Sequence, residues 1–313
     1  MIYIFSNFKM TKNLSKGPTG LLKWVGESLE EKKIAYKLVS EPEVVNKLRN
    51  KLILIYPSKN FFKLSKETRR SNKITTIGPD SITIQYYSLL LFYFPFLKKL
   101  FLNRFIKKTL CNIFDDVKSM KNNTNLLVGK NDVKFLNKIG GKYQELPHPF
   151  ISSVNSKEPL LPSHLIDNDI IIIGKSNGLP TAFKDLEKPI KKYLIPLINL
   201  SKRKLYIFES TGLNIEKNSN IEFISRSTNI SSKFFQSKIV LNPSICGGGT
   251  ANRSLSALFD GSFLFSTEFG IRNIDLELFR DRIIVSEYSP FKKEFYEHLM
   301  RCKFSKINPN NID

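Results

Sequence analysis

Short apolar segments alternate with helix-length amphipathic stretches along almost the whole chain, and this alternation constrains the fold most. In the first half the apolar segments are residues 2–6, 35–40, 52–57, 74–78 and 125–129. In the second half they are residues 169–174, 204–210, 221–225, 238–243, 262–267 and 282–288. Runs as apolar as these are typical of strands that are buried on both faces of a parallel sheet. The sequence therefore predicts an α/β protein whose parallel sheets are covered by helices on both sides.

A proline-rich stretch separates the two halves. It contains Pro147, Pro149, Pro159 and Pro162 and follows neither the helical nor the strand period, which is typical of a linker. We expect two Rossmann-like, doubly wound domains that face each other across a cleft, where such sheets bind ligands. The expected boundaries are a first domain over 1–150, a linker over 151–165, a second domain over 166–288, and a C-terminal helix within 289–313 that can pack back on the first domain.

The charge balance favours an anionic partner. Lys and Arg number 49 against 28 Asp and Glu, a formal net charge of +21, which suits nucleic acid, anionic lipid or a phosphorylated substrate. The three cysteines have no close spacing, so they form neither a disulfide framework nor a zinc knuckle, as is usual in a reducing cytoplasm. The first residues lack a signal-peptide pattern, and the apolar run 89–97 is far shorter than the roughly 20 residues that span a bilayer. We therefore expect a cytoplasmic protein.

The most unusual local feature is the run Gly247–Gly249, which follows the predicted strand ending at Pro243 and precedes a helical pattern that starts near Thr250. Unpaired N–H groups and the helix dipole favour a phosphate at such a position, and missing side chains let it approach. The alternative is a tight turn that needs positive φ. A dinucleotide fingerprint fails because Asn252 stands where its last glycine belongs, and a Walker loop fails because Asp169 replaces its first glycine.

The segment "KIVLNPSICGGGTANRSLSALFDGSFLFSTEFG" resembles the donor-site segment of GT-B glycosyltransferases of the family 4 type. Arg253 matches the family's basic residue, Gly261 its glycine and Thr267 its threonine. Weaker similarities cover residues 16–22, 126–150 and 170–178. The resemblance implies an enzyme, a glycosyltransferase that moves a sugar from a nucleotide-sugar donor to a saccharide or lipid-linked acceptor in surface polysaccharide or glycolipid synthesis. It also implies a retaining, metal-independent reaction with no cofactor.

The same resemblance implies roles for individual residues. Arg253 and Lys175 would be the catalytic cations that neutralise the leaving diphosphate. The other donor-binding residues would be Gly247, Gly248, Gly249, Thr250, Asn252, Ser256, Gly17 and Gly20. Ser256 stands where the family carries a glutamate that holds the ribose, and a serine loses that charge-assisted bidentate contact. A catalytically silent GT-B subunit is therefore an alternative. No metal site is expected, because the acidic triplet 167–169 precedes a strand and does not follow one.

A basic aromatic stretch over 88–108 has two interpretations. It carries five cations and no acid: Lys98, Lys99, Arg104, Lys107 and Lys108. One interpretation is an interfacial helix on an anionic membrane, which would make the protein peripheral on the inner face of the cell membrane. The other is a core helix with snorkelling lysines. A nucleic-acid-binding protein is a further alternative from the net charge, although no recognised nucleic-acid-binding module supports it.

Overall fold

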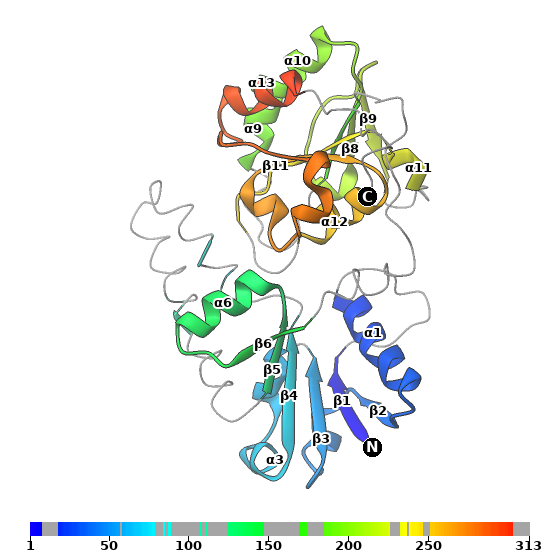
Figure 1. Ribbon diagram of the computed structural model, residues 1–313, viewed down its shortest axis with the longest axis vertical. Helices are drawn as coiled ribbons and strands as arrows, with labels where there is room; N and C mark the ends of the chain where they lie inside the picture. Colours follow the sequence, from blue (N-terminus) through cyan, green and yellow to red (C-terminus); the bar gives the residue numbers. More distant parts are fainter. Residues whose placement is uncertain are drawn as a thin grey trace. The chain divides into compact units, whose positions relative to one another are not determined.

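The computed structural model (Figure 1) describes residues 1–7, 18–56, 58–78, 124–146, 169–173, 185–225, 232–236, 238–246 and 251–302, together with residues 84, 87, 88, 107, 110 and 111. The described residues up to 146 form one compact unit, and those from 169 onward form a second. The predicted linker 151–165 lies outside the described residues, so its boundaries stay a prediction.

The first unit is built on a six-stranded sheet in the order β2-β1-β3-β4-β5-β6. Its strands are β1 (Ile2–Ser6), β2 (Tyr36–Val39), β3 (Leu52–Tyr56), β4 (Lys73–Gly78), β5 (Thr124–Val128) and β6 (Tyr143–Leu146). Its helices are α1 (Pro18–Glu31), α2 (Pro42–Val45), the 3-10 helix η1 (Ser58–Lys63), α3 (Lys66–Ser71) and α6 (Lys130–Lys138). All five strand pairings are parallel. The winding reverses between β1 and β3, which is where open sheets of this kind bind ligands.

Both faces of this sheet are buried, as the apolar strands predicted. Ile4 belongs to one buried cluster with Leu21 and Leu22 of α1, whereas Phe5 belongs to another with Val45 of α2. Successive side chains of a strand point to opposite faces, so these neighbours in β1 mark the two sides of the sheet. Helices therefore cover both faces of the sheet at β1, and the ends of the central strands are the positions where a ligand can approach.

The second unit contains another six-stranded sheet, in the order β12-β11-β10-β7-β8-β9. Its strands are β7 (Ile170–Ile172), β8 (Leu205–Phe208), β9 (Ile221–Ile224), β10 (Ile239–Asn242), β11 (Phe263–Ser266) and β12 (Ile283–Val285). Its helices are α9 (Glu187–Pro189), η2 (Ile190–Leu194), α10 (Ile195–Leu200), η3 (Glu209–Thr211), α11 (Ser232–Phe235), α12 (Asn252–Phe259), η4 (Glu268–Ile271), η5 (Glu277–Arg282) and α13 (Lys293–Arg301). The pairings between these strands are also parallel. From β7, strands β8 and β9 extend to one side and strands β10, β11 and β12 to the other, so the winding reverses between β7 and β10. The predicted fold class, with two Rossmann-like doubly wound sheets, is confirmed.

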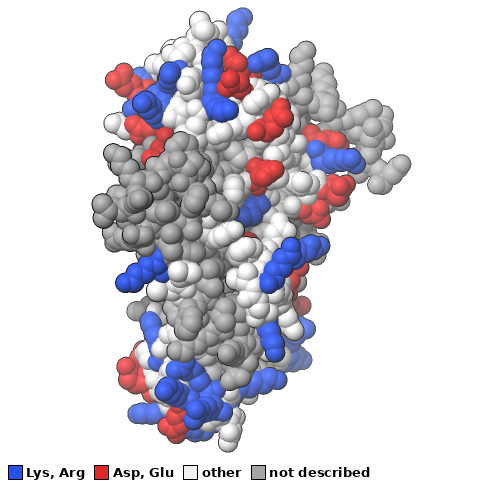
Figure 2. All heavy atoms as spheres, turned by 90° about the vertical axis from the view of Figure 1, so that its left-hand side faces the viewer, with Lys and Arg blue, Asp and Glu red and all other residues white. Residues whose placement is uncertain are grey.

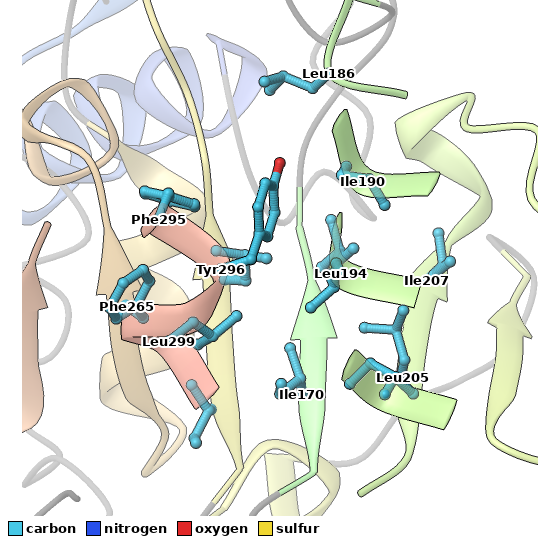
Figure 3. Packing of buried hydrophobic residues seen from close by; sticks show 14 of the residues in the cluster. Ile170, Leu186, Ile190, Leu194, Leu205, Ile207, Phe265, Phe295, Tyr296 and Leu299 are labelled. Atoms are coloured by element: carbon cyan, nitrogen blue, oxygen red, sulfur yellow. The ribbon is translucent and has the colours of Figure 1, made fainter. Parts of the chain in front are cut away.

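The core of the second unit includes the last helix of the described chain. Phe295, Tyr296 and Leu299 of α13 are fully buried in one cluster with strand residues such as Ile170 and Phe265, as Figure 3 shows. Their spacing of one and four residues places them on a single face of the helix. Helix α13 thus packs on the second sheet. Packing of segment 289–313 back on the first domain stays a prediction.

Candidate functional site

The buried carboxyl ends of β10 and β11 are polar, although the rest of these strands is apolar. Asn242 ends β10 and Ser266 ends β11, and the two residues are register partners in the parallel sheet. Asn242 is 6% exposed and Ser266 is 0% exposed, so both must find hydrogen-bond partners inside the protein. The carboxyl end of β10 adjoins the point where the winding of the sheet reverses, the usual ligand-binding position of such sheets.

A buried network joins this strand end to two helices. The Asn242 Nδ2 donates to Ser254 Oγ at 2.7 Å and to the Gly270 carbonyl oxygen at 3.2 Å. The Ser254 hydroxyl in turn donates to the same carbonyl at 2.7 Å. The Ser266 hydroxyl donates to the Asn242 carbonyl at 2.9 Å. Because Ser254 lies in the first turn of α12 and Gly270 lies in η4, this network fixes the start of α12 against the end of the sheet.

Further hydrogen bonds hold the chain on both sides of residues 247–250. Before them, Ser244 donates through its hydroxyl to Asn242 Oδ1 at 2.6 Å, and the Thr267 hydroxyl donates to the Ser244 carbonyl. After them, the Ala251 N–H donates to the Arg272 carbonyl at 3.0 Å. The described residues on both sides of 247–250 are therefore fixed at the carboxyl edge of the second sheet.

Gly270 is required by the close packing of this network. A Cβ atom there would lie 2.0 Å from Ser266 Oγ and 2.7 Å from the Asn242 carbonyl oxygen. Real Cβ atoms do not approach other atoms so closely, and the nearest backbone atom cannot move without moving β10. Any larger residue at this position must displace η4 or the end of β10, and with them the anchor of α12.

Helix α12 has the apolar pattern that the sequence predicted. Leu255, Leu258 and Phe259 are buried, whereas Asn252 and Arg253 in its first turn are exposed. Ser256 is half-buried. The first turn of α12 contains no acidic residue, so no carboxylate of its own compensates the positive end of the helix dipole. Such an end, next to a sheet switch point, can hold an anion.

The structure tests the positions of only part of the predicted site. It brings Asn252, Arg253 and Ser256 together on α12, and it places Gly20 in the first turn of α1, after the carboxyl end of β1. Lys107 is an exposed helical residue. The other predicted residues lie outside the described part of the chain: Gly247, Gly248, Gly249, Thr250, Lys175, Gly17, Lys98, Lys99, Arg104 and Lys108. Their roles stay predictions.

Three residues of this edge were missed by the sequence reasoning: Asn242, Ser254 and Gly270. For Asn242 a signal was present, because a polar residue that directly follows three apolar residues of a buried strand marks its end. For Ser254 and Gly270 the sequence offers no comparable signal, since their partners lie 12 to 28 residues away.

Burial changes the proton affinity of two groups that flank α12. It raises the pKa of the Cys246 thiol to about 11, an effect opposed by the nearby Arg272. It lowers the pKa of the Arg282 guanidinium to about 10. Arg282 donates through Nη1 to the Leu258 carbonyl at 2.9 Å and lies over the Phe279 ring, 5.0 Å from its centroid. This buried cation supports the last turn of α12, opposite the end fixed by Asn242.

The acidic triplet 167–169 has a structural role at its one described residue. The Asp169 carboxylate accepts a hydrogen bond from the Lys204 N–H at 2.8 Å, just before β7 and β8. It therefore lies at the amino edge of the sheet, away from the edge described above. Among the residues that the structure describes, no three His, Cys, Asp or Glu side chains gather as metal ligands would. None of the described helices combines the length and apolar character needed to cross a bilayer.

Comparison with known proteins gives a likeness of fold. No protein-family model and no curated protein matches the sequence. The chain is similar to HepE of Anabaena, whose structure was solved with UDP and glucose, with a TM-score of 0.50 and 8% identity over 96% of this chain and 90% of that one. It is also similar to S. aureus TarM (TM-score 0.49, 10% identity, 83% of this chain) and to a trehalose-6-phosphate synthase (TM-score 0.48, 11% identity, 97% of this chain and 91% of that one). The chain spans about half the length of TarM, 50% in that structure and 55% in another. At such low identity the likeness establishes the fold alone, which is the GT-B fold with two Rossmann-like domains.

Proposed function

We propose that the protein is a glycosyltransferase, of the family 4 type within the GT-B fold, that takes its sugar from a nucleotide-sugar donor. The observation that carries the proposal is the buried network of Asn242, Ser254 and Gly270, which anchors α12 at the switch point of the second sheet. A chain that only needed to turn at this point would not require two buried side chains and a crowded glycine to fix the start of the next helix. The fold is similar to that of HepE, whose structure was solved with UDP and glucose, and this likeness supports a nucleoside diphosphate as the ligand.

The proposed mechanism assigns a separate role to each part of the edge. The N–H groups of Gly248, Gly249 and Thr250 would donate to the donor diphosphate, and Arg253 and Lys175 would balance its charge as the sugar bond breaks. Asn252 and Ser256 would contact the ribose. Gly17 and Gly20 would let the loop after β1 approach the donor. Retention of configuration, independence of metals and a saccharide or lipid-linked acceptor in surface polysaccharide or glycolipid synthesis are part of the proposal.

Cys246 provides an internal reporter for the donor. It is half-buried and directly precedes the glycine run, whereas Cys302 is buried in the second core and Cys111 is exposed. Alkylation would be followed by mass spectrometry at each cysteine, with and without UDP, GDP, ADP or TDP. We expect one nucleotide to slow alkylation of Cys246 and leave Cys111 unchanged. If no nucleotide alters Cys246, and calorimetry detects no binding at millimolar concentration, the donor site is wrong.

Ser256 favours a second candidate, a catalytically silent GT-B subunit. This half-buried residue stands on α12 at the position that the resemblance assigns to the ribose-binding glutamate. The variant Ser256→Glu restores a carboxylate there. Donor hydrolysis by the wild-type protein would support the enzyme, whereas hydrolysis by the variant alone would support the silent subunit.

A cytoplasmic protein at the inner face of the membrane is the proposed location, with Lys98, Lys99, Arg104, Lys107 and Lys108 as the lipid contacts. Sedimentation with anionic vesicles tests this proposal. Replacement of these five cations by Gln should weaken binding, and unchanged binding would refute this contact. Binding of nucleic acid, which the net charge also permits, would instead weaken steeply with salt.

A further inference from the structure

The positive charge of the chain is concentrated in the first unit. Residues 1–146 contain 27 Lys and Arg against 11 Asp and Glu, a large share of the formal +21. Within it, residues 46–73 contain nine Lys and Arg and one acid, Glu67. That acid is engaged, because Arg49 Nη2 lies 2.6 Å from its Oε1. The charge excess of this segment is therefore a local property of the surface, beyond the general lysine content of the chain.

These cations lie on α3, on the end of η1, on the loop that enters β3 and on the first residue of β4. Figure 2 shows that Lys and Arg side chains outnumber the Asp and Glu side chains among them at the end of the first unit where α3 lies in Figure 1. The exposed members of this basic surface are Lys47, Lys51, Lys63, Lys66, Arg70 and Lys73. Since β3 and β4 are parallel and begin here, the surface lies at the amino edge of the first sheet. Gly20 follows the carboxyl end of β1, so a donor phosphate at that opposite edge does not account for the basic surface.

The backbone beneath the basic surface is held by hydrogen bonds. The Lys73 N–H donates to the Lys51 carbonyl at 2.9 Å, and the Asn50 N–H donates to the Ser71 carbonyl at 2.8 Å. Asn72 links the same loops, because it accepts from the Lys51 N–H at 2.9 Å and donates to the Leu48 carbonyl at 2.9 Å. The lysines therefore project from a fixed scaffold.

One large apolar side chain is exposed among these cations, since Phe62 precedes Lys63 in η1 and is 41% exposed. On neighbouring α2, Val44 is 43% exposed beside the acids Glu41 and Glu43. Phe62 packs edge-on against Phe61 with ring centroids 5.5 Å apart, and Arg69 lies over the same Phe61 ring at 5.1 Å. Helix α2 adjoins this region, because the Ser65 N–H donates to the Asn46 side chain at 2.8 Å. An aromatic ring bordered by cations matches the chemistry of a membrane interface, where rings enter the headgroup layer and lysines attract anionic lipid.

We infer that this basic surface docks on an anionic lipid bilayer. Lysine predominates among its exposed cations, and lysine acts as a point charge that suits a diffuse anionic surface. Two of the arginines that could form bidentate contacts with nucleic acid are engaged within the protein, Arg49 with Glu67 and Arg69 with Phe61. The inference adds a second contact to the membrane association proposed above and does not depend on the donor site.

Vesicle sedimentation of the full chain tests the inference, with phosphatidylcholine alone or mixed with phosphatidylglycerol. The test variant replaces Lys47, Lys51, Lys63, Lys66 and Lys73 with Gln. The matched control makes the same change at exposed lysines of the second unit: Lys188, Lys202, Lys204, Lys217 and Lys292. Both variants lose the same charge, so only a localised contact separates them. Circular dichroism and urea unfolding verify that each variant is folded.

We expect the wild-type protein to bind the mixed vesicles, and the test variant to bind at least about a hundredfold more weakly, because each cation near an anionic surface contributes about fivefold. The control variant should lose far less. Phe62→Ser should weaken binding several-fold even at high salt, since its contribution is apolar. Three results would overturn the inference. The two lysine variants could lose vesicle binding equally, or binding could fall only when the cations at 98–108 are replaced. The protein could also bind single-stranded nucleic acid in preference to vesicles. A failure of donor binding would leave these outcomes unchanged.

Discussion

Gly270→Ala tests the packing on which the candidate site rests. The added methyl would lie 2.0 Å from Ser266 Oγ, 2.7 Å from the Asn242 carbonyl oxygen and 2.9 Å from Asn242 Cγ, where ordinary contacts need about 3.5 Å or more. Gly270 is not among the glycines with positive φ, so the cost comes from crowding. Overpacking of this kind costs about 1–3 kcal/mol. Loss of the bond from Ser266 to Asn242 adds about 1 kcal/mol. We therefore expect the second unit to lose about 3 kcal/mol of unfolding free energy.

Two comparisons separate crowding from other effects. In Gly140→Ala the new Cβ meets nothing within 4 Å, but the alanine must keep the glycine's φ of +94°. Only backbone strain of about 1 kcal/mol is therefore expected. In Gly270→Ala combined with Ser266→Ala the closest contact disappears. Ser266→Ala should therefore cost about 1 kcal/mol alone and stabilise the Gly270→Ala protein, a coupling that a double-mutant cycle measures.

The assay must follow each unit separately, since a chain with two units need not unfold in one step. Trp24, the one tryptophan of the sequence, lies in α1 and reports on the first unit by its fluorescence. Cys302, which is 9% exposed in the second core, reports on the second unit by its alkylation in urea. If Gly270→Ala destabilises the second unit by less than about 1 kcal/mol, or if Ser266→Ala has the same effect in both backgrounds, the described packing is wrong.

Three further predictions concern the same edge. Asn242→Ala should lower the unfolding free energy of the second unit in urea by about 3 kcal/mol, because several buried hydrogen bonds lose a partner. Asn218→Ala, at an exposed position, should cost well under 1 kcal/mol, and equal costs would contradict the network. The alkylation rate of Cys246 should rise about tenfold per pH unit up to about pH 11, since only the thiolate reacts and burial raises its pKa; a plateau near pH 9 would show an ordinary thiol. Arg282→Met should destabilise α12 by about 1–3 kcal/mol, because the Leu258 carbonyl loses a buried hydrogen-bond donor. Hydrogen exchange of the last turn of α12 should become faster, and unchanged exchange would contradict a stabilising role of Arg282.

The sequence by itself determined where most strands lie and that they are parallel. Each of the eleven predicted apolar segments overlaps an observed strand; β10 lies within 238–243 and β11 within 262–267, whereas β4 and β5 begin one residue before their segments. This succeeded because burial on both faces leaves a local mark, a short run of apolar residues. Strand β6 was not among those segments. It is an edge strand of four half-buried or exposed residues, so its sequence lacks that mark.

Only the tertiary structure decided which polar residues build the candidate site. The sequence drew attention to the glycine run and to Ser256, whereas the structure adds Asn242, Ser254 and Gly270, which fix the start of α12. A similar limit applies to charge. The number of lysines can be read from the sequence, but only the structure shows that the lysines where β3 and β4 begin lie at the same amino edge of one sheet. Apolar periodicity is a property of neighbouring residues and can be read along the chain. Hydrogen-bond partners and shared surfaces join residues far apart in sequence, so they exist only once the chain has folded.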